Sequence, residues 1–236
     1  MKLSFVNDSI VALVAHPDDA ELLCAGTLAR AKAEGADIAI CVCCQGEKGV
    51  PSRPVKNLTA VRRREMRAAA KVLGAKVFFL EVPDSDLADS KAVRKKAIEV
   101  LRRCRATLVL AHAANDYHSD HRAASALADS VSWFAASRGH KTTSPPLDSP
   151  PAVWWMDTIN MLGFEPGFFV DVSTHVAVKQ EMLACHKSQL ARGDDGDFSP
   201  LSELMELQYR TRGMQSGVAA AEAFRIHPAF KRVAAF

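Results

Sequence analysis

The sequence predicts an α/β protein: a three-layer, Rossmann-like fold with a mostly parallel sheet and helices on both faces. Short apolar runs alternate along the chain with longer patterns typical of helices. Strands that alternate with helices in this way form parallel sheets covered on both faces. The chain of 236 residues suits one such domain, so residues 1–236 are expected to fold as a single unit.

In the first half of the chain, four apolar runs alternate with four helical patterns. Gly74 provides a natural end for the second of these helices. In chain order we expect strands at 10–14, 37–44, 76–80 and 107–111, followed respectively by helices at 22–32, 58–73, 91–103 and 121–136.

The second half of the chain begins with a segment rich in Pro and Ser at 138–151, which indicates a long surface loop. Too little core-forming sequence follows this loop for a second domain. Beyond it we expect strands at 152–156 and 168–172 and helices at 175–188, 201–209 and 217–224.

Composition and charge exclude several classes of protein. A net charge of +3 with scattered Lys and Arg gives no basic surface for nucleic acid. No apolar run reaches the roughly 18 residues that a membrane-spanning helix needs. The apolar stretch near the start is short and interrupted by Asp8, unlike a signal peptide. We therefore expect a cytoplasmic protein without a nucleic-acid partner or a membrane span.

The six cysteines are expected to be free thiols. Cys41 and Cys44 form a C-x-x-C pattern, but they lie in a predicted strand, where residues three apart point to opposite faces. Buried thiols commonly pack as small apolar side chains, so neither disulfides nor a structural zinc site are predicted.

The strongest functional signal lies where the first strand ends. His16, Asp18, Asp19 and Glu21 closely follow the apolar run at 10–14. Open α/β sheets bind ligands in the crevice beyond the carboxyl ends of their strands. One imidazole and three carboxylates at such a buried position are costly without a compensating charge, which a divalent cation would supply.

A second polar cluster, with His118, Asp120 and His121, follows the strand at 107–111 and precedes a helix. Because all strands of a parallel sheet end at one edge, we expect the two clusters to meet in one crevice. One His from each cluster and a carboxylate make the His₂-carboxylate set of catalytic zinc, with a position open for water. Ferrous iron accepts the same set.

These clusters, HPDD with Glu21 and H-x-D-H, resemble the motifs of the PIG-L/LmbE-like family of metal-dependent N-acetyl-sugar deacetylases. The resemblance covers most of the chain. It extends to three later patterns, namely Gly46-Glu47-Lys48-Gly49, Arg62-x-x-Glu65 and His186-x-x-Gln189. It implies a small-molecule amino-sugar substrate and, by family analogy, a homo-oligomer.

The resemblance also implies roles for single residues. His16, Asp19 and His121 match the metal ligands, with Zn²⁺ as the expected ion and Fe²⁺ as the alternative. Asp18 matches the general base, and His118 matches the histidine that stabilises the oxyanion.

Three further residues carry over from the same motifs. Asp120 matches the residue that holds the orientation of His118, and Arg62 matches an arginine that contacts substrate. Tyr117 lies one residue before His118, whereas some members place a catalytic tyrosine two residues before that histidine.

The implied reaction is hydrolysis of an N-acetyl amide. Zinc lowers the pKa of bound water to about 7, and Asp18 would take the proton of this water and return it to the departing amine. The metal and a protonated His118, kept cationic by Asp120, would stabilise the oxyanion.

Several residues keep two interpretations. Glu47 and Asp84 either contact the sugar or belong to solvated loops. Glu21 either supports a ligand histidine or is an acid at a helix start. His186 and Gln189, one helical turn apart, either form a structural network or act directly.

The function keeps alternatives too. A metal-dependent amidase acting on a thiol conjugate or a non-sugar amide would show the same metal-site residues. The loops at 45–57 and 138–151 would then select the substrate. A non-catalytic sugar-binding protein would have lost a ligand or the base, and none is missing here.

Overall fold

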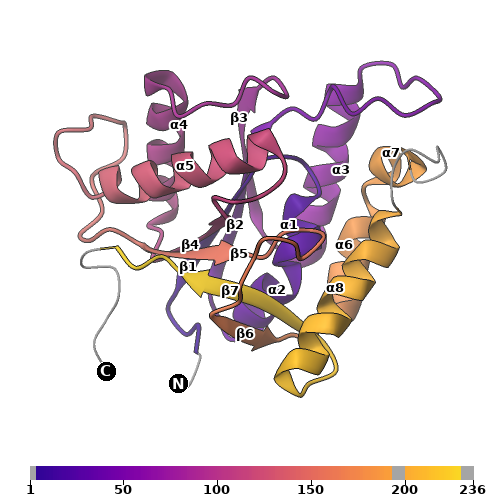
Figure 1. Ribbon diagram of the computed structural model, residues 1–236. Helices are drawn as coiled ribbons and strands as arrows, with labels where there is room; N and C mark the ends of the chain where they lie inside the picture. Colours follow the sequence, from indigo (N-terminus) through magenta and orange to yellow (C-terminus); the bar gives the residue numbers. More distant parts are fainter. Residues whose placement is uncertain (1–3, 193–199, 230–236) are drawn as a thin grey trace.

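The computed structural model describes residues 4–192 and 200–229. Within these residues one seven-stranded sheet has the order β3-β2-β1-β4-β5-β7-β6 (Figure 1). The strands are β1 (Ser9–Val14), β2 (Asp37–Cys44), β3 (Lys76–Val82), β4 (Leu108–His112), β5 (Ala152–Met156), β6 (Phe168–Asp171) and β7 (Ala221–Ile226). The helices are α1 (Asp19–Leu23), α2 (Ala25–Ala33), α3 (Leu58–Leu73), α4 (Lys91–Cys104), α5 (Ser119–Phe134), α6 (Val176–Ala184), α7 (Lys187–Leu190) and α8 (Leu201–Ser216).

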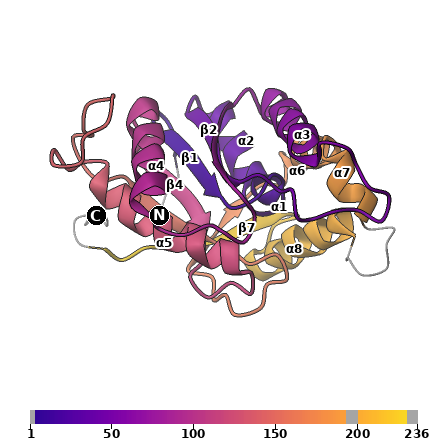
Figure 2. The ribbon, with the colours of Figure 1, turned by 90° about the horizontal axis from the view of Figure 1, so that it is seen from above.

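The sheet is mostly parallel, and this confirms the predicted fold class. Strands β1 to β5 pair in parallel, whereas β7 runs antiparallel to both β5 and β6. Helices α4 and α5 pack on one face, and the remaining helices cover the other face (Figure 2). Both faces are therefore buried, which explains why the central strands are apolar throughout.

The order of the strands places the site. β1 lies between β2 and β4, so the chain leaves β1 toward one side of the sheet and reaches β4 on the other. In open α/β sheets the crevice at such a switch point is where ligands bind. The two polar clusters of the sequence follow β1 and β4.

The predicted helix at 217–224 is wrong. Gly217, with φ 75°, ends α8 in the left-handed conformation, and 221–226 is strand β7. The Ala-rich sequence favours a helix by propensity. However, Ala221 and Phe224 are fully buried in the sheet between β5 and β6, and this burial overrides the local preference.

Two other predicted helices are interrupted. The helix at 22–32 begins earlier, at Asp19, and breaks at Cys24, whose φ of −146° is not helical. The helix at 175–188 ends at Ala184, and the short α7 follows it.

The cysteine prediction holds in its main part. Cys24, Cys41, Cys43 and Cys44 are free and buried, while Cys104 and Cys185 are half-buried. Among the described residues, no helix has the length and apolar character needed to cross a membrane.

Candidate active site

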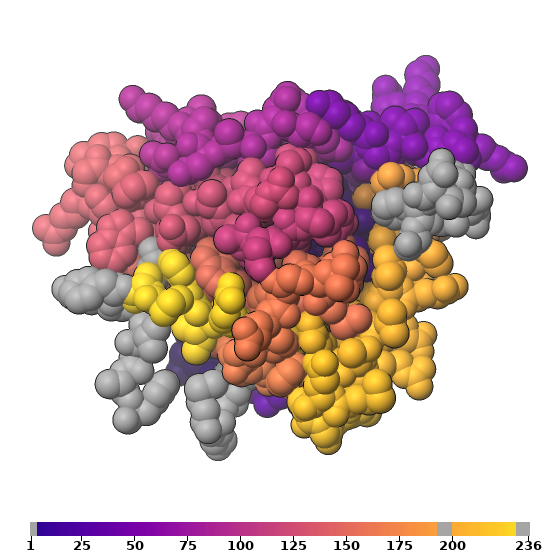
Figure 3. All heavy atoms as spheres, in the orientation of Figure 1, coloured from indigo at the N-terminus to yellow at the C-terminus, as the bar shows by residue number. Residues whose placement is uncertain are grey.

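The two polar clusters lie side by side at the carboxyl edge of the sheet. β1 and β4 are parallel neighbours, and a cavity of about 280 Å³ opens where they end. Figure 3 shows the surface hollowed between pink atoms around α5 and orange atoms around α7, with indigo atoms of the first segment deep inside. The cavity is lined by all six residues expected to carry the chemistry, namely His16, Asp18, Asp19, His118, Asp120 and His121.

A strained turn after β1 presents two adjacent carboxylates to this cavity. Asp18 has φ 111°, a conformation that L residues rarely adopt and that concentrates at functional sites. Asp19 holds the turn, because its Oδ2 accepts a hydrogen bond of 2.7 Å from the backbone N–H of His16. Both carboxylates are buried.

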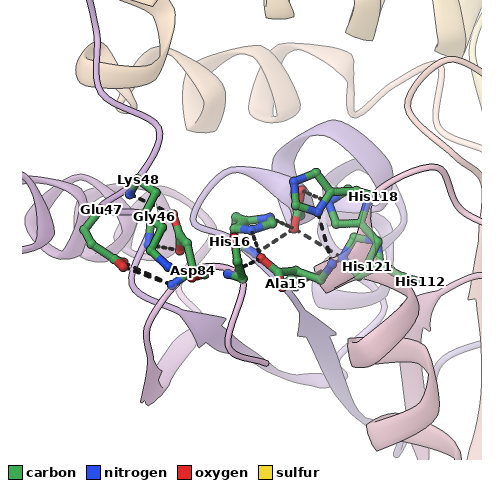
Figure 4. Close-up of polar contacts among 12 residues, drawn as sticks. Ala15, His16, Gly46, Glu47, Lys48, Asp84, His112, His118 and His121 are labelled. Atoms are coloured by element: carbon green, nitrogen blue, oxygen red, sulfur yellow. Dashed lines mark hydrogen bonds and ion pairs between the residues drawn. The ribbon is translucent and has the colours of Figure 1, made fainter. Parts of the chain in front are cut away.

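Asp19 lies between the two expected histidine ligands. Its Oδ2 is 3.5 Å from His16 Nδ1, and its Oδ1 is 3.4 Å from His121 Nε2. Ligand atoms of His16, His118 and His121 all lie within 4.8 Å of one another, and the same holds for Asp19, His112 and His121. The labelled histidines of these groups lie close together in Figure 4. These residues can therefore hold a metal ion.

Each expected histidine ligand also has a carboxylate on its other ring nitrogen. Asp120 Oδ2 lies 3.2 Å from His16 Nε2, and Asp116 Oδ1 lies 3.1 Å from His121 Nδ1. Such outer carboxylates fix the tautomer and orientation of histidines that bind metals. Both rings are thus held with their free side toward Asp19.

The electrostatics of the site suit a cation. Burial lowers the pKa of His16, but contacts with Asp120 and Asp19 outweigh it and raise this pKa to about 10. Burial likewise opposes protonation of His121, yet Asp19 and Asp116 raise its pKa to about 9. Enclosed carboxylates therefore attract positive charge here, and the donor set of two imidazoles and one carboxylate fits a divalent metal.

Asp18 has the environment of a general base. Burial, reinforced by the negative charge of Asp19, raises the pKa of Asp18 to about 7. A carboxyl with a pKa near the working pH accepts and releases a proton with little energetic cost. Asp18 lines the cavity beside Asp19. Within the described part of the chain, its carboxylate forms no hydrogen bond with the expected histidine ligands.

The expected ion pair between Asp120 and His118 is not formed. The Asp120 carboxylate contacts His16, and only its backbone N–H reaches His118, donating to Nδ1 over 3.1 Å. Burial, together with the positive charges of His16 and His121, lowers the pKa of His118. The lowered pKa favours the neutral ring over the imidazolium that the sequence suggested, and in the neutral ring the proton lies on Nε2 because Nδ1 accepts from the backbone.

Two residues that lie against the expected metal ligands are not among the site residues that the sequence predicts. His112, at the end of β4, is fully buried and stacks on His121 with ring centroids 4.0 Å apart. Its Nε2 accepts from the backbone N–H of Ala15. From the sequence alone, Asp116 could equally be a turn residue or a substrate contact. In the structure it accepts a hydrogen bond from the backbone N–H of His118, two residues on, and it also lies against His121.

The residues expected to contact substrate divide into two groups. Arg62 lines the cavity but is 1% exposed, and it donates to the carbonyls of Gly46 and Gly49. Asp84 also lines the cavity, and its carboxylate accepts from the backbone N–H groups of Gly46 and Lys48. Both residues shape the loop after β2, with part of each side chain toward the cavity.

Glu47 and Tyr117 differ in whether they reach the cavity. The carboxylate of Glu47 accepts from the backbone N–H of Asp84 (Figure 4) and does not line the cavity, so it braces two loops. Tyr117 lines the cavity with 61% of its surface exposed. The loop at 138–151, expected to select substrate, lines other pockets and does not reach this cavity.

Glu21 and His186 form a buried pair beside the site. His186 Nε2 lies 3.2 Å from Glu21 Oε1, and both side chains are fully buried. Glu21 stands in the first turn of α1, and its ion pair within the described part of the chain is with His186, not with an expected metal ligand. It therefore links α1 to the segment before α7.

A comparison with known protein families gives a match over the part of the chain that forms this site. The family model described as "PIG-L: GlcNAc-PI de-N-acetylase" matches residues 11–132, slightly more than half of the chain. The chain belongs to the PIG-L family. The match contains both polar clusters and the strands that position them.

Over most of its length, this PIG-L chain is similar to a known deacetylase and to a protein of known structure. It is 27% identical to the diacetylchitobiose deacetylase of Thermococcus kodakarensis, over 93% of this chain and 83% of that protein. It is 32% identical to the conserved protein TT1542 of Thermus thermophilus, with a TM-score of 0.80 over 94% of this chain and 96% of the other.

A third similar structure separates fold from reaction. GalB, the 4-carboxy-2-hydroxymuconate hydratase of Pseudomonas putida, has a TM-score of 0.81 at 23% identity, and the match covers 98% of this chain and 100% of the other. One fold thus carries both deacetylation and hydration. Function in the PIG-L chain must be argued from its site.

Proposed function

We propose that this chain is a zinc-dependent hydrolase that removes the N-acetyl group from an N-acetylglucosamine-type sugar or glycoconjugate. The observation that carries the proposal is that Asp19 lies against both His16 and His121, while a separate carboxylate, Asp18, lines the same cavity. Amide hydrolysis needs both the metal-ligand set and this carboxylate, because the nucleophile must lose a proton and the amine must gain one. Membership of the PIG-L family supports an N-acetyl sugar as the substrate class.

The metal would be held by His16, Asp19 and His121. A divalent ion in such a site polarises the carbonyl and makes water more acidic. Zinc is the proposed ion because it favours imidazole and carboxylate ligands in an open site. Ferrous iron uses the same donors, and metal analysis of the purified protein distinguishes the two.

Asp18 would move the proton during the reaction. With its pKa raised to about 7, it takes a proton from the attacking water as the C–O bond forms. It then passes this proton to the amide nitrogen as the C–N bond breaks, which releases acetate and the free amine. Positioned acid–base groups of this kind contribute roughly 10²–10⁴ in rate.

His118 would stabilise the oxyanion as a hydrogen-bond donor. Its Nδ1 accepts from the backbone N–H of Asp120, which leaves the proton on Nε2 in the neutral ring. A donor fixed in advance costs no reorganisation when the negative charge develops. A neutral imidazole therefore suffices for this role.

The test is amine release from N-acetylglucosamine, N,N'-diacetylchitobiose and thiol-conjugated or non-sugar amides. Metal-stripped protein is compared with protein restored with Zn²⁺ or Fe²⁺. His16→Ala should abolish release, whereas His227→Ala should not, because His227 contacts Asp129 outside the cavity.

Full activity of the stripped protein or of His16→Ala would disprove the proposal. Turnover confined to the thiol conjugate or the non-sugar amide would replace the sugar by that substrate. Absence of amine release from every one of these amides, with protein restored with either metal, would reject amide hydrolysis altogether.

A further inference from the structure

Helix α7 is fixed against its neighbours by buried polar contacts. His186, just before it, contacts Glu21 of α1. Ser188 donates from both its backbone N–H and its Oγ to the carboxylate of Glu65 in α3, over 2.9 and 2.6 Å. A helix of four residues has little stability of its own, so these contacts determine where α7 lies and where Gln189 points.

Gln189 is 4% exposed and lines the cavity. Its Oε1 accepts a hydrogen bond from the guanidinium of Arg62 and a longer one, 3.5 Å, from Arg192. Arginine can only donate. The oxygen of the amide must therefore face Arg62, and the usual ambiguity between the two ends of a glutamine side chain is removed.

The other end of the amide is unpaired. Nε2 of Gln189 donates to no group among the described residues, and it is not one of the polar atoms enclosed without contact to solvent. Gln189 lines the cavity that contains Asp18 and the expected metal ligands, so a ligand bound there can accept a hydrogen bond from Nε2.

We propose that Gln189 is a specificity-determining residue whose amide N–H groups donate to an oxygen of the bound sugar, a hydroxyl or the acyl carbonyl. This inference rests on the proposed function for the class of substrate. It assigns the contact to α7, an element outside both metal-binding loops. A substrate without an acceptor oxygen at this point would leave the donors unpaired and would bind less well.

Matched variants separate this role from a structural one. Gln189→Glu retains an oxygen toward Arg62 but has no N–H to donate, so an acyl carbonyl would face a carboxylate oxygen. Gln189→Met removes the donors for a sugar hydroxyl as well, because a hydroxyl could otherwise turn and donate to the carboxylate of Gln189→Glu. If Gln189 only holds Arg62, Gln189→Glu should behave like the wild type. Ser188→Ala loosens α7 through Glu65 and does not alter the lining of the cavity.

The measurement has two parts. KM and kcat for amine release from N-acetylglucosamine are determined with zinc-loaded protein. The Kd of N-acetylglucosamine is measured by calorimetry in an Asp18→Asn background, where hydrolysis should stop. Thermal unfolding of each variant shows whether it folds. Gln189→Met removes the donors without adding charge, and it also replaces Gln189→Glu if that variant does not fold.

We expect Gln189→Glu to raise KM and Kd by about 10- to 100-fold, with a smaller change in kcat. We expect Ser188→Ala to raise KM and Kd by less than Gln189→Glu does, because it loosens the support of α7 but leaves the donors of Gln189 in place. Unchanged KM and Kd in Gln189→Met would overturn the inference, as would an equal loss in Ser188→Ala; unchanged values in Gln189→Glu alone would exclude the acyl carbonyl as the acceptor. A wild type that binds the sugar without releasing amine would contradict the proposed function alone. A wild type that does not bind it would overturn both.

Discussion

Replacing Asp116 by Asn should weaken metal binding without unfolding the site. The Oδ1 of Asp116 lies 3.1 Å from His121 Nδ1 and also accepts a 2.9 Å hydrogen bond from the backbone N–H of His118. Asparagine has the same shape, so its Oδ1 can keep both contacts. It lacks the negative charge that makes the imidazole a stronger ligand.

Loss of such an outer partner typically costs about 10- to 100-fold in metal affinity. This corresponds to about 1.4–2.8 kcal/mol of binding free energy. The upper part of this range is expected, because Asp116 and His121 are both buried and water screens their interaction poorly.

Zinc affinity is measured by competition with a chromophoric chelator, starting from metal-free protein. Asp86→Asn serves as the control, because Asp86 is an exposed acid in the loop after β3. An affinity of Asp116→Asn equal to that of the control would refute the reasoning. It would mean that packing, such as the stacking of His112 on His121, is enough to hold the ring.

Two further predictions concern stability and pH. Lys179 Nζ lies 2.6 Å from Glu222 Oε1 in a fully buried pair. Lys179→Met should therefore lower the free energy of unfolding, measured in urea, by about 3–5 kcal/mol. The double variant with Glu222→Gln should lose less stability, and an equal loss would show that the unpaired charge of Glu222 is not the cause. Asp18 acts as a base only when ionised, and its pKa is raised to about 7. The value of kcat/KM should therefore be highest above this pH and fall as the pH decreases below it. A kcat/KM that does not change from neutral to mildly acidic pH would exclude Asp18 as the base.

Much of the fold could be predicted because it depends on patterns that are local in sequence. Apolar runs buried on both faces identify β1, β2 and β4 regardless of what covers them. β7 could not be identified in this way, since its Ala-rich sequence has the local preference of a helix. Its carboxylate at Glu222 accepts from the backbone N–H groups of Gly26 and Thr27, a contact between segments almost 200 residues apart.

The meeting of the two clusters was equally predictable, because parallel strands end at one edge. The contacts within the site were not. Gln189 reaches the cavity because α7 is fixed by Glu21 and Glu65, and neither spacing nor composition indicates these contacts. The break between α6 and α7, which turns His186 toward Glu21, likewise depends on tertiary packing.

The contact partner of Asp120 could not be predicted from the H-x-D-H motif. His118 is the N-cap of α5, and its Nδ1 accepts from the backbone N–H of Asp120, two residues on. Residues two apart at the start of a helix do not face each other, so the carboxylate of Asp120 points away from His118. It reaches His16 in the other loop instead. The acid in the H-x-D-H motif therefore serves the histidine of the first cluster, and its proximity to His118 in sequence is a property of the backbone alone.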